Sequence, residues 1–317
     1  MDFNPHLPGT LPEQGIAVPR LRPEGRIAII APAGPKAFDV PTAERWMAAR
    51  GYSLKIFPGA LQHTGYLAGS DSTRLQDLHD AFADDEIDAI MCLRGGYGSP
   101  RLLDRIDYAL LRRHIKPFVG YSDITALHMA IAKEAGFVTF HGPMLTSEVL
   151  ADRKPPTETS LRRMVRGQFR HGSELAHPSA WPLTSIAHGI SRGRLMGGNL
   201  AMICALEGTP WALEAEGIIL LIEDVNEPLY RVDRMLTQLR LSGKLAKIAG
   251  VLVGDFAGIS VEAMTPLLRQ TFEPLGVPVV AGWRSGHCDP NLTLPLGAMV
   301  RLDGGECRLW LEQDVVF

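Results

Sequence analysis

Short apolar runs alternate with amphipathic segments through the first half of this chain, and this alternation restricts the fold more than any other feature. The predicted strands are residues 27–31, 53–57, 89–93, 117–120 and 138–141. One predicted helix ends near residue 49, and two more cover residues 71–82 and 123–135. Strands joined by helices pair in parallel, and a parallel sheet must be covered on both faces. The pattern therefore predicts an α/β fold with a doubly wound, mostly parallel sheet whose functional loops follow the strands.

The rest of the chain divides by its composition. Residues 1–24 contain five prolines and predict an extended, loosely docked leader. Residues 25–150 form the α/β domain, residues 151–190 are expected to connect two domains, and residues 191–317 predict a second α/β domain with more strand than helix. Its predicted strands are residues 217–222, 249–253 and 278–281, with two more around residues 299–302 and 307–311.

Charge and cysteine content exclude several classes of protein. The net charge of −3 gives no basic surface, so neither nucleic acid nor an anionic membrane is an expected partner. The four cysteines form no C-x-x-C pair, which favours a reducing compartment. The first residues lack the features of a signal peptide, and no apolar run approaches the ~18 residues of a membrane span. A cytoplasmic protein is expected.

Ser122 stands directly between a predicted strand and a predicted helix. A tight turn there would expose its hydroxyl at the carboxyl end of the sheet, where a nucleophile could act. Residues 120–124 (GYSDI) match only the first part of G-x-S-x-G, because Ile124 replaces the second glycine. The competing interpretation is that Ser122 caps the helix, which is the commoner role of serine at this position.

A serine nucleophile needs a base and an acceptor that orients the base. Among ten histidines, His128, His141 and His287 lie near the predicted functional loops, and position alone does not separate His141 from His287. Glu223 follows a buried-type strand, where an acid has to face a cleft or solvent. It could equally pair with Arg231 or Arg234 of the next helix.

The glycine-rich loop at residues 94–98 (RGGYG) follows a predicted strand. Its free backbone N–H groups suit an oxyanion hole or a phosphate site, and a tight structural turn is the alternative. The adjacent His287, Cys288 and Asp289 are not spaced to bind one ion, and H-E-x-x-H is missing from the sequence, so no metal site is expected.

Six motifs together resemble the LD-carboxypeptidases, the muramoyltetrapeptide carboxypeptidases of bacterial cell-wall recycling. They are RGGYGSPRLL, KPFVGYSDITALH, TFHGPM, GRLMGGNL, LLIEDVNEPLYRVDRML and SGHCDPNLTLPLG, and the resemblance covers roughly residues 24–315. It implies a serine peptidase with Ser122 as nucleophile, Glu223 as carboxylate and His287 as base, and a site between two domains. It also implies a homodimer without metal or cofactor that releases D-alanine from the L-centre of diaminopimelate or lysine in a murein tetrapeptide.

Further residues are assigned by combining this resemblance with the chemistry. The N–H of Asp123 and an N–H of Gly95 or Gly96 are expected to form the oxyanion hole. The terminal carboxylate of the substrate calls for cations or amides. The candidates are Arg94, Tyr97, Arg101, Gly198 and Asn199.

Two alternatives stay open at this point. One is a hydrolase of peptidyl or aminoacyl nucleotide antibiotics, as in microcin immunity proteins. Those proteins need a loop with an aromatic side chain to bind the nucleobase, and this chain has no obvious loop of that kind. The other is a non-catalytic protein that binds a small ligand between two domains, with Ser122 as a helix cap.

Overall fold

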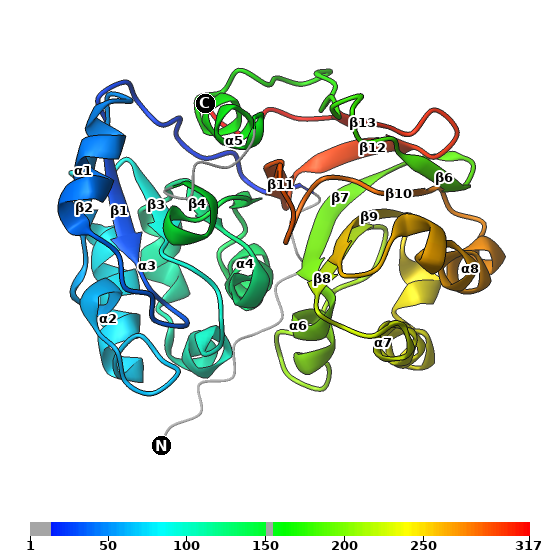
Figure 1. Cartoon of the computed structure of the whole chain (residues 1–317), viewed down its shortest axis with the longest axis horizontal. Coiled ribbons are helices and arrows are strands. Elements are labelled where there is room, and N and C mark those ends of the chain that lie inside the picture. The colour runs from blue at the N-terminus through cyan, green and yellow to red at the C-terminus, as the bar shows by residue number, and fades with distance from the viewer. Residues whose placement is uncertain (1–13, 150–154) are drawn as a thin grey trace.

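The computed structural model describes residues 14–149 and 155–317. Figure 1 shows two sheets with their helices side by side, the first half of the chain on the left and most of the second half on the right. No helix within the described ranges is both long and apolar enough to cross a membrane.

In the described residues the first sheet has six strands in the order β11-β5-β4-β3-β1-β2. The strands are β1 (Arg26–Ile30), β2 (Ser53–Ile56), β3 (Ala89–Cys92), β4 (Phe118–Gly120), β5 (Thr139–His141) and β11 (Leu294–Leu296). Strands β1 to β5 pair in parallel because helices connect them. These helices are α1 (Val40–Ala48), α2 (Asp71–Ala83), α3 (Tyr108–Arg113) and α4 (Thr125–Glu134). Ile29, Ile30 and Ile90 are fully buried, as expected for strands covered on both faces.

The second sheet has seven strands among the described residues, in the order β13-β12-β7-β8-β9-β10-β6. They are β6 (Thr184–Ala187), β7 (Ile190–Asn199), β8 (Ile219–Val225), β9 (Gly250–Ala257), β10 (Val279–Ala281), β12 (Met299–Asp303) and β13 (Arg308–Leu311). Figure 1 shows α6 (Leu200–Ala205), α7 (Leu229–Leu241) and α8 (Val261–Phe272) together on one side of this sheet, and α5 (Thr157–Val165) above the first sheet. The predicted fold class, a doubly wound parallel part followed by a strand-rich α/β part, is confirmed.

Two strands cross the predicted domain boundaries. β11 comes from the second half but pairs antiparallel with β5 of the first sheet, opposite His141 at Leu294. β6 comes from the predicted connection, residues 151–190, and pairs with β10 in the second sheet. A three-residue strand containing a proline has no periodicity to detect, and it is tolerated because β11 lies at the sheet edge. Its pairing ties the loop that carries His287 to the sheet that carries Ser122.

The described part of the predicted leader is extended but not loosely docked. Ile16 pairs with Phe137, and Val18 pairs with Val316. Val18 is fully buried and Leu21 nearly so, which means that this segment contributes to the core. The remainder of the leader, residues 1–13, lies outside the described residues.

Candidate active site

Ser122 occupies a strained turn directly after β4. It begins a short 3₁₀ turn (Ser122–Ile124) that leads into α4, and its φ is +65°, a value that non-glycine residues rarely adopt. The N-cap position of α4 is Ile124, without a side-chain cap, and the Ser122 hydroxyl bonds to no other described residue. The helix-cap interpretation of Ser122 is therefore wrong. Strain of this kind is typical of a serine held out for reaction.

Glu223 and His287 form a buried pair. Glu223 lies in β8 with no exposed surface, and its Oε2 accepts a hydrogen bond of 2.7 Å from Nδ1 of His287. Gly286 has φ +106°, and a side chain there would collide with Glu223, which explains the glycine before His287. Arg231, the alternative partner, binds Glu227 at 2.8 Å.

The electrostatics of this pair favour a charged carboxylate and a basic imidazole. Burial by itself would raise the pKa of Glu223, but contacts with His141 and His287 bring this pKa down to about 2. Burial by itself would lower the pKa of His287, but the adjacent Glu223 carboxylate outweighs burial and raises the pKa. With Nδ1 bonded to Glu223, the Nε2 atom is left as the proton acceptor.

Both halves of the chain line one cleft of about 390 Å³. The rings of Tyr121, which precedes Ser122, and His287 meet edge to face with centroids 4.9 Å apart. Over the described residues, Ser122 Oγ and His287 Nε2 share no hydrogen bond. Such bonds are often long in a ligand-free site and shorten when substrate binds.

The glycine loop after β3 lies against Ser122. A Cβ atom at Gly95 would lie 2.9 Å from Ser122 Oγ and 3.4 Å from the backbone nitrogen of Asp123, so only glycine permits this approach. Gly96 has φ +113°, which also favours glycine. The arrangement brings the backbone of both candidate oxyanion-hole segments beside the hydroxyl.

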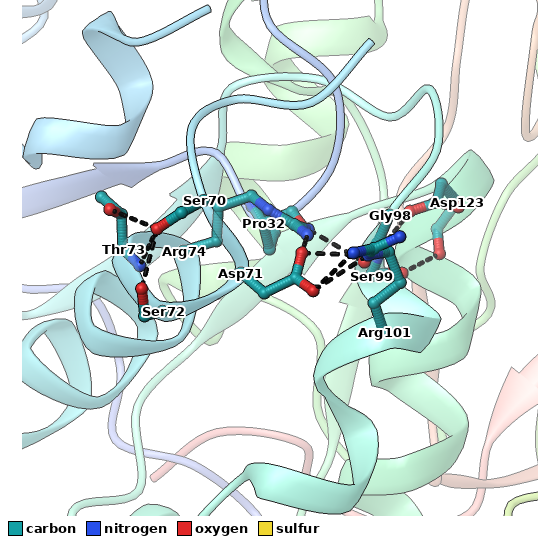
Figure 2. A network of polar contacts seen from close by, with 10 residues as sticks. All are labelled: Pro32, Ser70, Asp71, Ser72, Thr73, Arg74, Gly98, Ser99, Arg101 and Asp123. Atoms are coloured by element: carbon teal, nitrogen blue, oxygen red, sulfur yellow. Dashed lines mark hydrogen bonds and ion pairs between the residues drawn. The ribbon is translucent and has the colours of Figure 1, made fainter. Parts of the chain in front are cut away.

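A buried polar network holds this loop in place (Figure 2). Arg74, 1% exposed, donates to the carbonyl of Gly98 at 2.9 Å and also to that of Pro32. Asp123 accepts from the backbone N–H of Ser99 at 2.8 Å. Because the network joins α2, the loop and the nucleophile turn, it fixes their relative positions.

The structure separates three candidates for the substrate carboxylate. Arg94 is half-buried and lines the cleft, where its Nη1 also donates to the carbonyl of Pro35 at 3.2 Å. Arg101 instead makes a two-pronged ion pair with Asp71, at 2.8 to 3.0 Å, outside the cleft lining. Tyr97 is 47% exposed and packs on Tyr66 away from that lining.

Gly198 and Asn199, the other two candidates, are not among the residues that line the cleft, and both make structural contacts. Asn199 caps α6 and its amide donates to Asp224 at 2.9 Å. Gly198 has φ +132°, and a Cβ atom there would lie 2.6 Å from Thr125 Oγ1 and 3.4 Å from the His141 ring. The backbone N–H of Asn199 also donates to Thr125 Oγ1 at 3.0 Å, so both residues pack the second sheet against the first half of the chain.

Other cleft residues were not proposed as substrate-binding or catalytic residues from the sequence. They are Lys36, Tyr121, Thr146, Ser147, Glu148, Cys288 and Asp289. Lys36 lies in the loop between β1 and α1, so the rule that functional residues lie in the loops after parallel strands could have identified it. Glu148 accepts a hydrogen bond from Tyr121, a contact without a sequence signal. In the described ranges no cluster of three or more His, Cys, Asp or Glu side chains could hold a metal ion.

Comparison with known proteins gives the family. Residues 27–142 match the LD-carboxypeptidase N-terminal domain, and residues 192–302 match the LD-carboxypeptidase C-terminal domain. A probable murein peptide carboxypeptidase of Bacillus subtilis is 40% identical over 299 residues, covering 92% of each chain. A murein tetrapeptide carboxypeptidase of Pseudomonas aeruginosa is 32% identical over 300 residues, covering 90% of this chain and 95% of that protein.

Solved structures agree. The muramoyltetrapeptide carboxypeptidase from Oxalobacter formigenes superposes with a TM-score of 0.75 at 32% identity, over 90% of this chain and 97% of that one. The microcin C7 self immunity protein MccF has a TM-score of 0.85 at 23% identity, over 95% of this chain and 100% of that one, which shows a shared fold alone. The resemblance inferred from the six motifs is confirmed, and the chain belongs to the LD-carboxypeptidase family.

Proposed function

We propose that this protein is a serine carboxypeptidase that removes the terminal D-alanine from murein tetrapeptides, cutting after the L-centre of diaminopimelate or lysine. The observation that carries the proposal is the Glu223–His287 pair, whose imidazole packs against Tyr121, the residue before the strained Ser122, in a cleft lined by both halves of the chain. The names of relatives that are 32% and 40% identical support the substrate class.

The proposed reaction uses these residues in two steps. Nε2 of His287 takes the hydroxyl proton while Ser122 Oγ attacks the carbonyl carbon before D-alanine, and the oxyanion accepts N–H bonds from Asp123 and from Gly95 or Gly96. His287 then gives its proton to the departing amine, which leaves an acyl-enzyme. A water molecule, deprotonated by His287, attacks the acyl carbon; the bond to Ser122 Oγ breaks, His287 returns the proton to this oxygen, and the shortened peptide is released. Glu223 stays ionised and stabilises the imidazolium.

The free carboxylate of the leaving residue needs a cation in the cleft. Arg94 and Lys36 both line the cleft and supply positive charge there. We assign the carboxylate to Arg94, because its planar guanidinium is half-buried and can bind both oxygens. A cytoplasmic site of action, favoured by the cysteine content, and a homodimer, implied by the family resemblance, complete the proposal.

Arg94→Ala is expected to raise KM for the tetrapeptide by about 10- to 100-fold, the effect of losing one charged hydrogen bond. The value of kcat should change much less, since the lost contact is present in substrate and transition state alike. Arg101→Ala is the matched control, because Asp71 holds that side chain outside the cleft lining. Equal KM values for both variants and the wild type would overturn the assignment of Arg94.

A three-substrate assay tests the function. Purified protein is mixed with a murein tetrapeptide ending in D-alanine, with the same peptide ending in L-alanine, and with an aminoacyl sulfamoyl adenylate. Release of alanine from the first peptide alone is expected. Release of the nucleotide instead would favour an antibiotic hydrolase of the microcin immunity type, and binding of the tetrapeptide without cleavage would favour a non-catalytic protein.

A further inference from the structure

A second buried imidazole faces the carboxylate of Glu223. His141, the last residue of β5, has no exposed surface, and its Nε2 lies 3.7 Å from Oε1 of Glu223. His287 already occupies the other oxygen, Oε2, at 2.7 Å. Neither His141 Nε2 nor Glu223 Oε1 has a hydrogen-bond partner among the described residues. Two buried polar atoms without partners thus face each other.

The contacts of His141 indicate which ring nitrogen carries the proton. Nδ1 lies 3.1 Å from the hydroxyl oxygen of Ser285, which stands two residues before His287. If the serine hydroxyl donates to Nδ1, the hydrogen of the neutral ring is on Nε2 and points at Glu223. His141 then contacts both the carboxylate and the loop that carries the base.

The remaining gap is small. An N–H···O bond is usually ~2.9 Å long, so the 3.7 Å separation exceeds it by about 0.8 Å. Buried donors and acceptors almost always find partners, because an unpaired one loses its bonds to water without compensation. A shift of this size in β5 or β8 closes the contact.

Among the residues that the structure describes, the other titratable neighbours of His141 use their polar atoms elsewhere. His128 on α4 lies 6.5 Å away between ring centroids and uses its own nitrogens on Gly120 and Thr139. Tyr121 packs at 5.7 Å but donates its hydroxyl to Glu148.

The charges that act on His287 besides Glu223 lie elsewhere. Glu148 and Asp224 contribute to the charge around His287, and Asp255 interacts electrostatically with both His287 and Glu223. Asp224 bonds to Asn199 and to the N–H of Ala201. Among these groups, Glu223 is the one that faces His141 Nε2.

We propose that His141 is a positioning residue for the serine peptidase reaction, whose Nε2–H holds Oε1 of Glu223 so that Oε2 stays aimed at His287. The inference rests on the proposed function for its kinetic consequence. Because His141 comes from the first sheet and Glu223 from the second, the contact makes the orientation of the carboxylate depend on how the two sheets pack.

Losing this donor should have two consequences. The carboxylate becomes less well oriented, which should lower kcat by about 10- to 100-fold, as is typical when an outer partner of a reactive group is removed. The ionised carboxylate then lacks the hydrogen bond from His141 that stabilised it, so it interacts more strongly with the His287 imidazolium and the pKa of His287 should rise.

The test compares His141→Leu with His141→Gln in the full chain, since the glutamine amide can still donate to Oε1. We expect His141→Leu to lower kcat, to leave KM within about twofold, and to move the acidic limb of kcat/KM toward higher pH. His141→Gln should restore most of kcat and the position of that limb. If leucine prevents folding, His141→Asn replaces it, because its shorter amide cannot reach Oε1.

A readout without substrate separates this inference from the proposed function. The pKa of His287 is measured by NMR titration of ring-labelled histidine, and it should rise in His141→Leu and return in His141→Gln. His79→Gln serves as a control, because His79 lies on α2 and its Nε2 accepts from the backbone N–H of Asp107 at 2.9 Å. An unchanged His287 pKa in a folded His141→Leu protein would overturn the inference. A wild type that cuts no tetrapeptide would overturn the proposed function alone.

Discussion

Ser122→Ala is expected to lower kcat for the tetrapeptide by about 10⁴- to 10⁶-fold, as removal of a serine nucleophile does in other peptidases. The residual rate would come from the oxyanion hole and substrate binding. The chain should remain folded, because the Ser122 hydroxyl makes no hydrogen bond to the described residues. Rates come from initial velocities of D-alanine release, with melting curves recorded on the same samples.

Ser70→Ala gives the matched control for this prediction. Ser70 is a true helix cap, because its Oγ accepts from the N–H of Thr73 at 3.1 Å at the start of α2. Its loss should cost about 1 kcal/mol of unfolding free energy and leave turnover unchanged. Near-normal turnover in Ser122→Ala would remove the nucleophile assignment.

The same position should show a conflict between activity and stability. The backbone of Ser122 has φ +65°, a conformation that costs a non-glycine residue roughly 1 kcal/mol. Ser122→Gly should therefore be inactive yet as stable as the wild type or more so, because glycine adopts this φ without strain.

Glu223→Gln is expected to lower kcat by about 10⁴-fold, the effect of an amide in place of the orienting carboxylate in a serine triad. The amide carries no charge to stabilise the imidazolium, and its NH₂ group can bind the other tautomer of His287. Because Glu223 raises the pKa of His287, the acidic limb of kcat/KM for the residual activity should move to lower pH. The pH profile thus distinguishes lost orientation from unfolding.

The stability of the wild type should also depend on this carboxyl group. Its pKa in the folded protein is about 2, below the ordinary value of 4.5, so its ionised form stabilises the fold above pH 4.5. This contribution is lost as the pH falls from 4.5 toward 2, and Glu223→Gln should lack that part of the pH dependence. Glu227→Gln is the control, since Glu227 pairs with Arg231 at a half-exposed helix start and should alter kcat less than twofold.

Local pattern predicted much of the first sheet. The strand around Ile29 and the helix that begins after Ser122 show in hydrophobic periodicity, which depends only on near neighbours in sequence. Strand β11 was not predicted from this periodicity, because Leu294–Leu296 becomes a strand only by pairing with β5. A contact over that sequence distance leaves no periodic signal in three residues.

The candidate site divides in the same way. Ser122, Glu223 and His287 were named from motifs, but position could not rank His287 above His141. In the fold both imidazoles face Glu223, His287 at hydrogen-bond distance and His141 at 3.7 Å. From the sequence, Arg94 and Arg101 were likewise equal candidates. In the structure, the ion pair with Asp71 holds Arg101 outside the cleft lining.

The sequence by itself determined the alternating α/β pattern, the family and the residue types available for acyl transfer, because these depend on local periodicity and on motifs. The tertiary structure alone decided which side chains meet: that Ser122 is strained rather than a cap, that Glu223 lies between two imidazoles, and that Gly198 and Asn199 join the sheets. The physical reason is that hydrogen bonding, burial and charge act through distances in space, and residues from both halves of the chain come within those distances only after folding.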